Sequence, residues 1–373
     1  MFLSDEEKIN ALRLMMSENV GPATYNQLLK YYRSASEAIR HIDELAKRGG
    51  RKKEIKLVPD SKVRKQFEIA EKENVKILFS SDKEYPENLK HLSDASPILF
   101  VKGNLDILSK KSVSIVGTRN ASLNGKVLAR KIAHDLSEAG YNVVSGMAHG
   151  IDRAAHVGAL ASSNHLTTAV LGTSVNEIYP IENNDIYQEL SEKGCLISEF
   201  PFDSILNPRN FPRRNRLIAG ISLGTLVIEA QEKSGSLITA HFAADYGREV
   251  FAVPGSPVDP RSSGPNALIR EGATLVSNAQ DVITTLENMT RFTLKETTKE
   301  DNYQIIPINE ENLKDARSIV IENLGPDLVS IDTLIQETGL DARLINIILV
   351  ELELAGRLER HTGNRVSLIY NME

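Results

Sequence analysis

The chain has 373 residues, of which 41% are hydrophobic and 25% charged, and its formal net charge at pH 7 is −6. These values are typical of a soluble protein of two or three domains, and the mild acidity argues against a domain that wraps duplex DNA. No apolar run approaches the length of a membrane span, and the charged N-terminus lacks the core of a signal peptide. The single cysteine, Cys195, excludes an internal disulfide and a cysteine-based zinc site, so we expect a cytoplasmic protein.

Residues 1–75 are expected to form an N-terminal helical domain, because their apolar residues recur at helical spacing. Within them, Asn19-Val20-Gly21-Pro22-Ala23-Thr24 predicts a turn followed by the start of a helix, since proline favours the first helical position. This turn fits a SAM-like or helix-hairpin-helix domain, in which it contacts DNA backbone. It also fits an ordinary helix–loop–helix pair, which the sequence favours.

Residues 76–290 alternate strand-like apolar runs with amphipathic patterns, such as those at 125–139 and 237–246. This alternation predicts an α/β fold with a doubly wound, mostly parallel sheet. In such a sheet the loops that follow the strands carry the ligand. The clearest predicted strands are Ser112–Val116, Tyr141–Val144, Leu166–Leu171, Cys195–Ser198, Thr225–Ile228 and Glu249–Val253.

The first two of these strands end in loops with different chemistry. Gly117-Thr118-Arg119 lacks the glycines of a dinucleotide-binding fingerprint, so NAD or FAD is not expected, and Arg119 instead places a cation at the top of the sheet. The second loop reads Ser145-Gly146-Met147-Ala148-His149-Gly150-Ile151-Asp152. Its glycines and serine predict a nest of backbone N–H groups for an anion, with Asp152 capping the next helix.

Residues 209–216 read Arg-Asn-Phe-Pro-Arg-Arg-Asn-Arg and lie between two predicted strands. We interpret them as a rigid loop whose guanidinium forks suit phosphate oxygens and base edges. The alternatives are a solvated basic loop and structural ion pairs, for instance with Glu199 or Asp203. The loops of this edge show no Ser-His-Asp order and no obvious acid–base pair of carboxylates. They therefore indicate a site that holds phosphate and base rather than one that breaks bonds.

Residues 291–312 are polar and predict a linker, and residues 313–373 predict a winged-helix domain of three helices and a two-stranded ribbon. The third predicted helix, Asp341–Ala355, has a net charge of −2. A helix that reads a DNA groove normally carries cations and amides. We therefore favour a protein-contact or regulatory role for this domain.

Several of these segments resemble motifs of the DNA-processing protein A family, also called DprA or Smf. The resemblance is highly specific over residues 100–290 and less diagnostic in the flanking zones. It implies an extended Rossmann-like domain that binds single-stranded DNA without cleaving it. It also implies a homodimer that loads RecA recombinase onto incoming strands during natural transformation. The motifs are Ile115–Arg119, Ser145–Asp152, Tyr179–Asn183, Asn210–Gly220, Ser234–Ala240 and Val250–Gly255.

The resemblance also implies which residues line the pocket, with no catalytic residue, cofactor or metal. One position departs from the family pattern, because His149 stands where lysine or arginine is usual, and histidine is mostly neutral at pH 7. Carried over by motif, the pocket residues are Gly117, Arg119, Ser145, Gly146, Gly150, Arg214, Asn215 and Arg216. The same sheet edge adds Thr118, His149, Asn183, Ser234 and Ser236.

The alternative function is enzymatic. Residues 219–229 are loosely similar to the Gly-Gly-x-Gly-Thr-x-x-Glu loop of Rossmann-like nucleoside monophosphate phosphoribohydrolases. The first glycine pair and the spacing do not match that loop, which puts a catalytic role for Glu229 in doubt. Release of ribose 5-phosphate from AMP would favour the enzyme, and retention of single strands would favour the binding protein.

Overall fold

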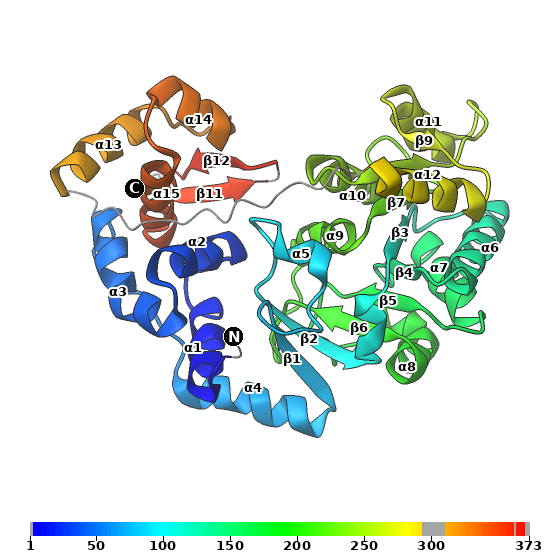
Figure 1. Ribbon diagram of the computed structural model, residues 1–373, viewed down its shortest axis with the longest axis horizontal. Coiled ribbons are helices and arrows are strands. Elements are labelled where there is room, and N and C mark those ends of the chain that lie inside the picture. The colour runs from blue at the N-terminus through cyan, green and yellow to red at the C-terminus, as the bar shows by residue number, and fades with distance from the viewer. Residues whose placement is uncertain (1–2, 293–309, 362, 370–373) are drawn as a thin grey trace. The chain divides into compact units, whose positions relative to one another are not determined.

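The computed structural model describes residues 3–292, 310–361 and 363–369, which form two compact units (Figure 1). The α/β unit comprises Lys65–Thr293, and the terminal unit combines Leu3–Arg64 with Leu294–Glu373. The sequence-based division expects separate N-terminal and C-terminal domains, whereas the structure joins the two ends of the chain in one unit. Most of the expected linker, 291–312, lies outside the described residues. No helix within the described ranges is long and apolar enough to cross a bilayer.

The terminal unit contains the N-terminal helices and the expected winged helix. Ser4 and Ser34 cap α1 and α3 through their side chains, and Pro22 opens α2 directly after Gly21, as predicted. A small antiparallel sheet has the order β10-β12-β11. The elements are α1 Asp5–Met15, α2 Pro22–Tyr32, α3 Ala35–Arg48, α13 Glu310–Glu322, β10 Val329–Ser330, α14 Ile331–Thr338, α15 Ala342–Leu354, β11 Leu358–His361 and β12 Arg365–Leu368, with α4 Asp60–Lys72 continuing into the α/β unit.

The α/β unit is built on a sheet of order β1-β2-β6-β5-β4-β3-β7-β8-β9. In this order, all neighbouring strands from β6 through β3 to β9 pair in parallel. Strand β2 pairs antiparallel with β6, and β1 pairs antiparallel with β2 at the edge of the sheet. The strands are β1 Val75–Phe79, β2 Ile98–Gly103, β3 Ser112–Val116, β4 Asn142–Ser145, β5 Thr167–Val170, β6 Cys195–Ser198, β7 Gly224–Val227, β8 Glu249–Ala252 and β9 Thr274–Leu275.

Helices cover both faces of this sheet, which confirms the predicted doubly wound fold. Residues of α6, α7 and α12 share one hydrophobic core with Ile115 of β3, and residues of α5, α9, α10 and α11 share a second core with Val116, the next residue of the same strand. Because both faces are buried, the strands are nearly continuous apolar runs. The helices are α5 Glu87–Lys90, α6 Leu123–Glu138, α7 Ile151–Leu160, α8 Asn184–Lys193, α9 Asn210–Ile221, α10 Gly235–Asp245, α11 Ser263–Arg270 and α12 Ala279–Phe292, with 3₁₀ helices at Leu105–Ser109, Ile181–Asn183 and Pro260–Ser262.

The six predicted strands agree with β3 to β8 to within one residue at each end. From β3 the chain winds outward through β4, β5 and β6, and then returns to place β7 on the other side of β3. This reversal is a topological switch point, where loops at the carboxyl ends of neighbouring strands diverge and leave room for a ligand.

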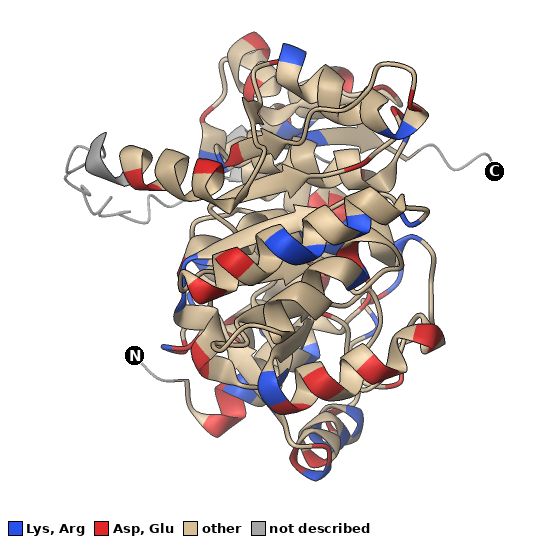
Figure 2. Ribbon diagram, turned by 90° about the vertical axis from the view of Figure 1, so that its right-hand side faces the viewer, with Lys and Arg blue, Asp and Glu red and all other residues tan. Residues whose placement is uncertain are grey.

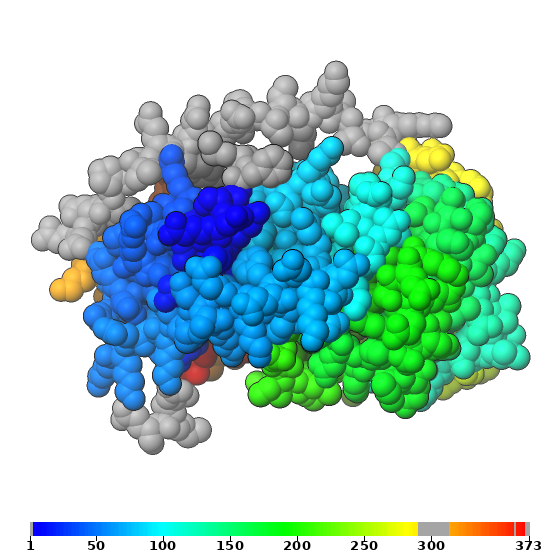
Figure 3. Space-filling model, turned by 90° about the horizontal axis from the view of Figure 1, so that it is seen from below, coloured from blue at the N-terminus to red at the C-terminus, as the bar shows by residue number. Residues whose placement is uncertain are grey.

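The surface of the unit mixes basic and acidic residues along its helices (Figure 2), and its cyan and green segments form a continuous face (Figure 3).

Candidate functional site

The loop after β4 does not present the free N–H nest that the sequence predicts. Asp152, in the first turn of α7, folds back over the loop, and its Oδ2 accepts hydrogen bonds from the N–H groups of Gly146 (3.2 Å) and Ala148 (3.4 Å). Burial raises the pKa of Asp152, although the nearby Arg214 guanidinium opposes this shift. The protein's own carboxylate therefore occupies the anion position. The prediction that Asp152 caps α7 is wrong, because the N-cap is Gly150 without a side-chain cap, and Asp152 holds the preceding loop instead.

Arg214 lies inside the protein beneath this loop. Its Nη1 donates to the carbonyl oxygens of Gly146 (2.7 Å) and Val170, so it joins the carboxyl ends of β4 and β5. A Cβ atom on Gly146 would stand 2.6 Å from this guanidinium, so a larger residue at this position would displace Arg214. Burial lowers the pKa of Arg214 to about 10, with Asp152 opposing the shift. The guanidinium thus positions the loops and is not free to bind a ligand.

Arg216 is also buried, but it points elsewhere. Its Nη2 forms an ion pair with Glu199, and its Nη1 donates to the carbonyl oxygen of Asp94 at 2.6 Å. The prediction that residues 209–216 form a loop is wrong, because the chain is helical from Asn210. Residues two apart on an α-helix are rotated by about 200° from each other, so Arg214 and Arg216 cannot converge on one anion. The ion pair with Glu199 agrees with the structural alternative.

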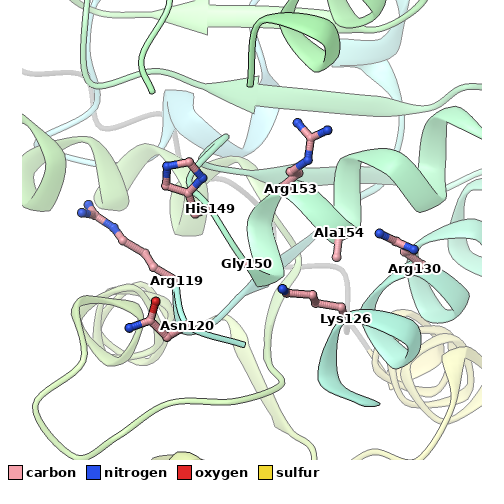
Figure 4. Close-up of a pocket in the computed structure, with 8 residues that line it drawn as sticks. All are labelled: Arg119, Asn120, Lys126, Arg130, His149, Gly150, Arg153 and Ala154. Atoms are coloured by element: carbon pink, nitrogen blue, oxygen red, sulfur yellow. The ribbon is translucent and has the colours of Figure 1, made fainter. Parts of the chain in front are cut away.

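An open, strongly basic pocket lies beside these loops, at the carboxyl ends of β3 and β4. Its volume is about 560 Å³, and no Asp or Glu is among the described residues that line it. Lys126 and Arg130 project from α6 on one side, and Arg119, His149 and Arg153 lie on the other (Figure 4). Asn120, Gly150 and Ala154 complete the lining. Such a pocket attracts anions, because cations on low-dielectric walls reinforce one another's potential.

The pocket cations differ in how far they are neutralised. Arg119, Lys126 and Arg130 form no ion pair with any residue in the described part of the chain. Arg153 is held by Asp185 through two bonds of 2.8 and 2.5 Å, and this contact lowers the pKa of Asp185 to about 2. His149 Nε2 lies 3.7 Å from a Glu182 carboxylate oxygen. Most of the unneutralised charge therefore comes from the loop after β3 and from α6.

Several of the other predicted site residues support the loops. Gly150 has φ +77°, and a Cβ there would stand 2.3 Å from the Thr118 carbonyl oxygen. Asn183 is buried, donates to the Met147 carbonyl oxygen at 2.7 Å and accepts from Arg153 at 3.0 Å. Gly117 lies against Ile151 and Glu229, and the Ser145 hydroxyl donates to the Ile115 carbonyl oxygen. Asn215 bonds to Arg214 and Gly235. The Ser234 hydroxyl caps α10 and bonds to Ser236.

Sequence reasoning missed the pocket residues on α6 and α7. Lys126 and Arg130 are spaced i, i+4 in a predicted helix and so share one face, which was a usable signal. Nothing local distinguishes Arg153 from a solvated arginine. The aromatic pair of Tyr179 and Phe211 was also missed as a surface: the two rings lie 5.1 Å apart, and Tyr179 is 39% exposed.

Glu229 is engaged at the start of α6. Its carboxylate accepts hydrogen bonds from the backbone N–H (2.9 Å) and the hydroxyl of Ser122, the residue that caps this helix. A Cβ on Gly125 would stand 2.5 Å from the same carboxylate carbon. In a dinucleotide fold this helix terminus would receive a phosphate. Here it receives Glu229, which disfavours both a dinucleotide at this terminus and a free catalytic carboxylate.

His156, on α7 below the pocket, makes the fold sensitive to acid. The ring is fully buried, and Nδ1 lies 2.8 Å from Thr167 Oγ1, which itself donates to Val143. Burial, with a smaller contribution from Arg214, lowers the pKa of His156 to about 3. Because the pKa of His156 is depressed in the folded state, the neutral ring contributes its full share of folding stability above pH ~6.5. That contribution is lost as the pH falls toward ~3, since protons then bind the unfolded chain.

We therefore expect His156→Asn to reduce the acid sensitivity of folding. The asparagine amide can keep the bond to Thr167, but it does not titrate. The free energy of unfolding of the wild type should fall by up to about 1.4 kcal/mol per pH unit more steeply than that of the variant, because one proton binds only the unfolded state. Urea unfolding between neutral pH and pH ~4 measures both slopes. Equal slopes would show that His156 is not responsible.

The family model of DNA recombination-mediator protein A matches residues 76–287. The chain belongs to the DNA-processing protein A (DprA/Smf) family. The family's N-terminal HHH domain matches residues 5–69, and its winged-helix domain matches residues 307–364. The resemblance inferred from the motifs is thus confirmed, including in the flanking zones, where the sequence was least diagnostic.

Curated relatives and solved structures agree with this assignment. Protein Smf of Escherichia coli is 36% identical over 293 residues, which cover 78% of this chain and 77% of that protein. DNA processing protein DprA of Streptococcus pneumoniae is 43% identical over 204 residues, 54% of this chain and 71% of that protein. Its X-ray structure matches 76% of this chain and 98% of that chain, with a TM-score of 0.64 and 32% identity.

A second solved structure concerns the single-stranded DNA binding mode of DNA processing protein A from Helicobacter pylori. It matches 58% of this chain and 96% of that chain, with a TM-score of 0.52 and 29% identity. Both structural matches support the extended Rossmann-like fold of the α/β unit.

Proposed function

We propose that the α/β unit binds single-stranded DNA through the basic pocket, without cleaving it. The observation that carries this proposal is the set of three cations, Arg119, Lys126 and Arg130, that share one open pocket and have no ion-pair partner among the described residues. Three phosphates of a strand, each with one negative charge, can neutralise such a set. Arg153 is already paired with Asp185, so it adds little net charge and would mainly orient a bound phosphate.

The aromatic pair at the same sheet edge favours a single strand over a duplex. Phe211, at the start of α9, lies against Gly172 after β5, and Tyr179 lies over it with its ring partly exposed. The segment of Tyr179 continues to Asn183, which contacts both Arg153 and the loop after β4. Stacking on aromatic rings requires unpaired bases, which only a single strand offers. We therefore infer that the cations bind the phosphates of a single strand while its bases turn toward the protein and stack on the rings.

The relatives support the DNA-binding part of this proposal. The family model is that of a recombination mediator, and the Helicobacter pylori relative binds single-stranded DNA. We extend this to a cytoplasmic homodimer that protects incoming strands and loads RecA recombinase onto them during natural transformation. The engagement of Glu229 at α6 supports a protein that binds DNA without an enzymatic step, in preference to a phosphoribohydrolase.

Fluorescence anisotropy with a labelled single strand and its blunt duplex tests the proposal. We expect clearly tighter binding of the single strand, and faster assembly of RecA on strands that the protein has already bound. Equal affinity for the two DNA forms would contradict the proposed site. Release of ribose 5-phosphate from AMP in the same preparation would instead favour the enzyme.

A further inference from the structure

The third helix of the winged helix is covered by the N-terminal helices. Within the terminal unit, α15 packs against α3 and α2 as well as against α13 of its own domain (Figure 1). Only the first turn of this described helix is exposed, and from Ile347 to Leu352 every residue is buried. A groove-reading helix must present a solvated polar face to the bases. This helix has no such face along its central turns.

The approach of α3 to α15 is backbone to backbone. A Cβ atom on Gly49, at the end of α3, would stand 2.0 Å from the carbonyl oxygen of Glu351. Gly49 has φ −70° and ψ −6°, which any residue adopts easily. The requirement for glycine at this position therefore comes from the partner helix and not from the local backbone.

The predicted turn before α2 meets the other end of the same helix. Asn19 Nδ2 donates to the carbonyl oxygen of Leu354 at 3.1 Å, and a Cβ on Gly21 would lie 3.8 Å from the Glu353 carboxylate. Arg357, just after α15, donates to the Gly49 carbonyl oxygen at 3.2 Å. The turn that could contact DNA backbone and the helix that could read a groove therefore contact each other.

The acidic residues of α15 belong to this packing. Glu351 is fully buried and pairs with Arg317 of α13 at 2.7 Å, with Arg48 of α3 nearby. Glu353 pairs with Arg360 of β11 at 2.8 Å. Buried carboxylates of this kind need cationic partners, and those partners come from within the unit. The net negative charge of this helix is thus explained by its protein partners.

We propose that α15 is the docking surface of the N-terminal helices, so that the winged helix serves to join the two ends of the chain and does not read duplex DNA. This role is independent of strand capture by the α/β unit. Association of the two chain ends buries the apolar face of α15, which would otherwise remain exposed, and it covers both the turn and the helix that the sequence made candidates for DNA contact.

The full-length variant Gly49→Ala tests the docking. The new methyl group should separate α3 from α15 and raise hydrogen exchange of residues 35–48 and 342–354 together, by at least tenfold. Gly325→Ala is the matched control, because Gly325 lies in the same unit with no close neighbour and no positive φ, and it should leave both segments protected. Unchanged exchange of either segment in Gly49→Ala would overturn the proposal.

A milder variant and a ligand experiment complete the test if Gly49→Ala unfolds the whole unit. Asn19 has φ +59°, so Asn19→Gly removes the bond to Leu354 without backbone strain, and it should raise exchange of 342–354 to a smaller extent. Added duplex DNA should leave exchange of 342–354 unchanged in the wild type, and protection of this segment by duplex would overturn the proposal. The affinity of the variants for single-stranded DNA should equal that of the wild type. If the wild type itself fails to bind single strands, that result contradicts the proposed function and leaves the docking of α15 unaffected.

Discussion

Changing Arg119, Lys126 and Arg130 together to alanine is expected to weaken single-strand binding by roughly three orders of magnitude, because each lost charge-assisted hydrogen bond contributes at least about 1.5 kcal/mol. The slope of log affinity against log salt should become shallower by about 2, since each phosphate contact on a single strand releases about 0.7 counterion. The melting temperature should stay near that of the wild type, because these side chains are solvated and form no described ion pair.

A matched control separates the pocket from general charge. Lys110, Lys111 and Lys131 are three exposed cations of the same unit, and Lys110 and Lys111 precede β3 at the opposite edge of the sheet. Replacing these three lowers the net charge equally but should change affinity only slightly. Fluorescence anisotropy across a salt series measures both variants. Similar losses in the two would show that total charge, and not the pocket, draws the strand.

Changing Arg216 to alanine is expected to cost about 3–5 kcal/mol of folding free energy, because it leaves the buried Glu199 carboxylate without its buried cationic partner. The Glu199 side chain is 2% exposed and that of Arg216 is 8% exposed, so water cannot replace the lost partner. Denaturant unfolding followed by far-UV circular dichroism measures the loss. Any fall in single-strand affinity should then be confined to the unfolded fraction.

Arg213 provides the control for this prediction on the same helix. It also faces Glu199, at 3.6 Å, but its side chain is 46% exposed. An exposed ion pair contributes at most about 1 kcal/mol, so Arg213→Ala should be mild. Removing both charges, as in Arg216→Met with Glu199→Leu, should recover part of the stability lost by Arg216→Ala. Equal effects of Arg213→Ala and Arg216→Ala would mean that burial of the pair is unimportant.

The sequence by itself determined the architecture of the α/β unit and part of its site. Strands buried on both faces must be continuous apolar runs, so β3 to β8 could be placed from residues alone. The alternation of strands with helices then implied a doubly wound sheet with its loops on one edge. Arg119 could be assigned to that edge because it directly follows β3, and the absence of a second nearby glycine excluded a dinucleotide fingerprint.

The tertiary structure alone decided what each charged group does. Arg214 and Arg216 look accessible in the sequence, yet each is buried against a partner from another segment of the chain. Asp152 is buried as well, against the loop that directly precedes its own helix. The sequence could name Glu199 as one possible partner, but composition and local spacing cannot decide which partner a side chain takes. Its direction depends on the helix that carries it and on what packs against that helix. The same reason applies to the pairing of α3 with α15. Their contact depends on the close approach of Gly49 to Glu351, two residues some three hundred positions apart, which no local pattern encodes.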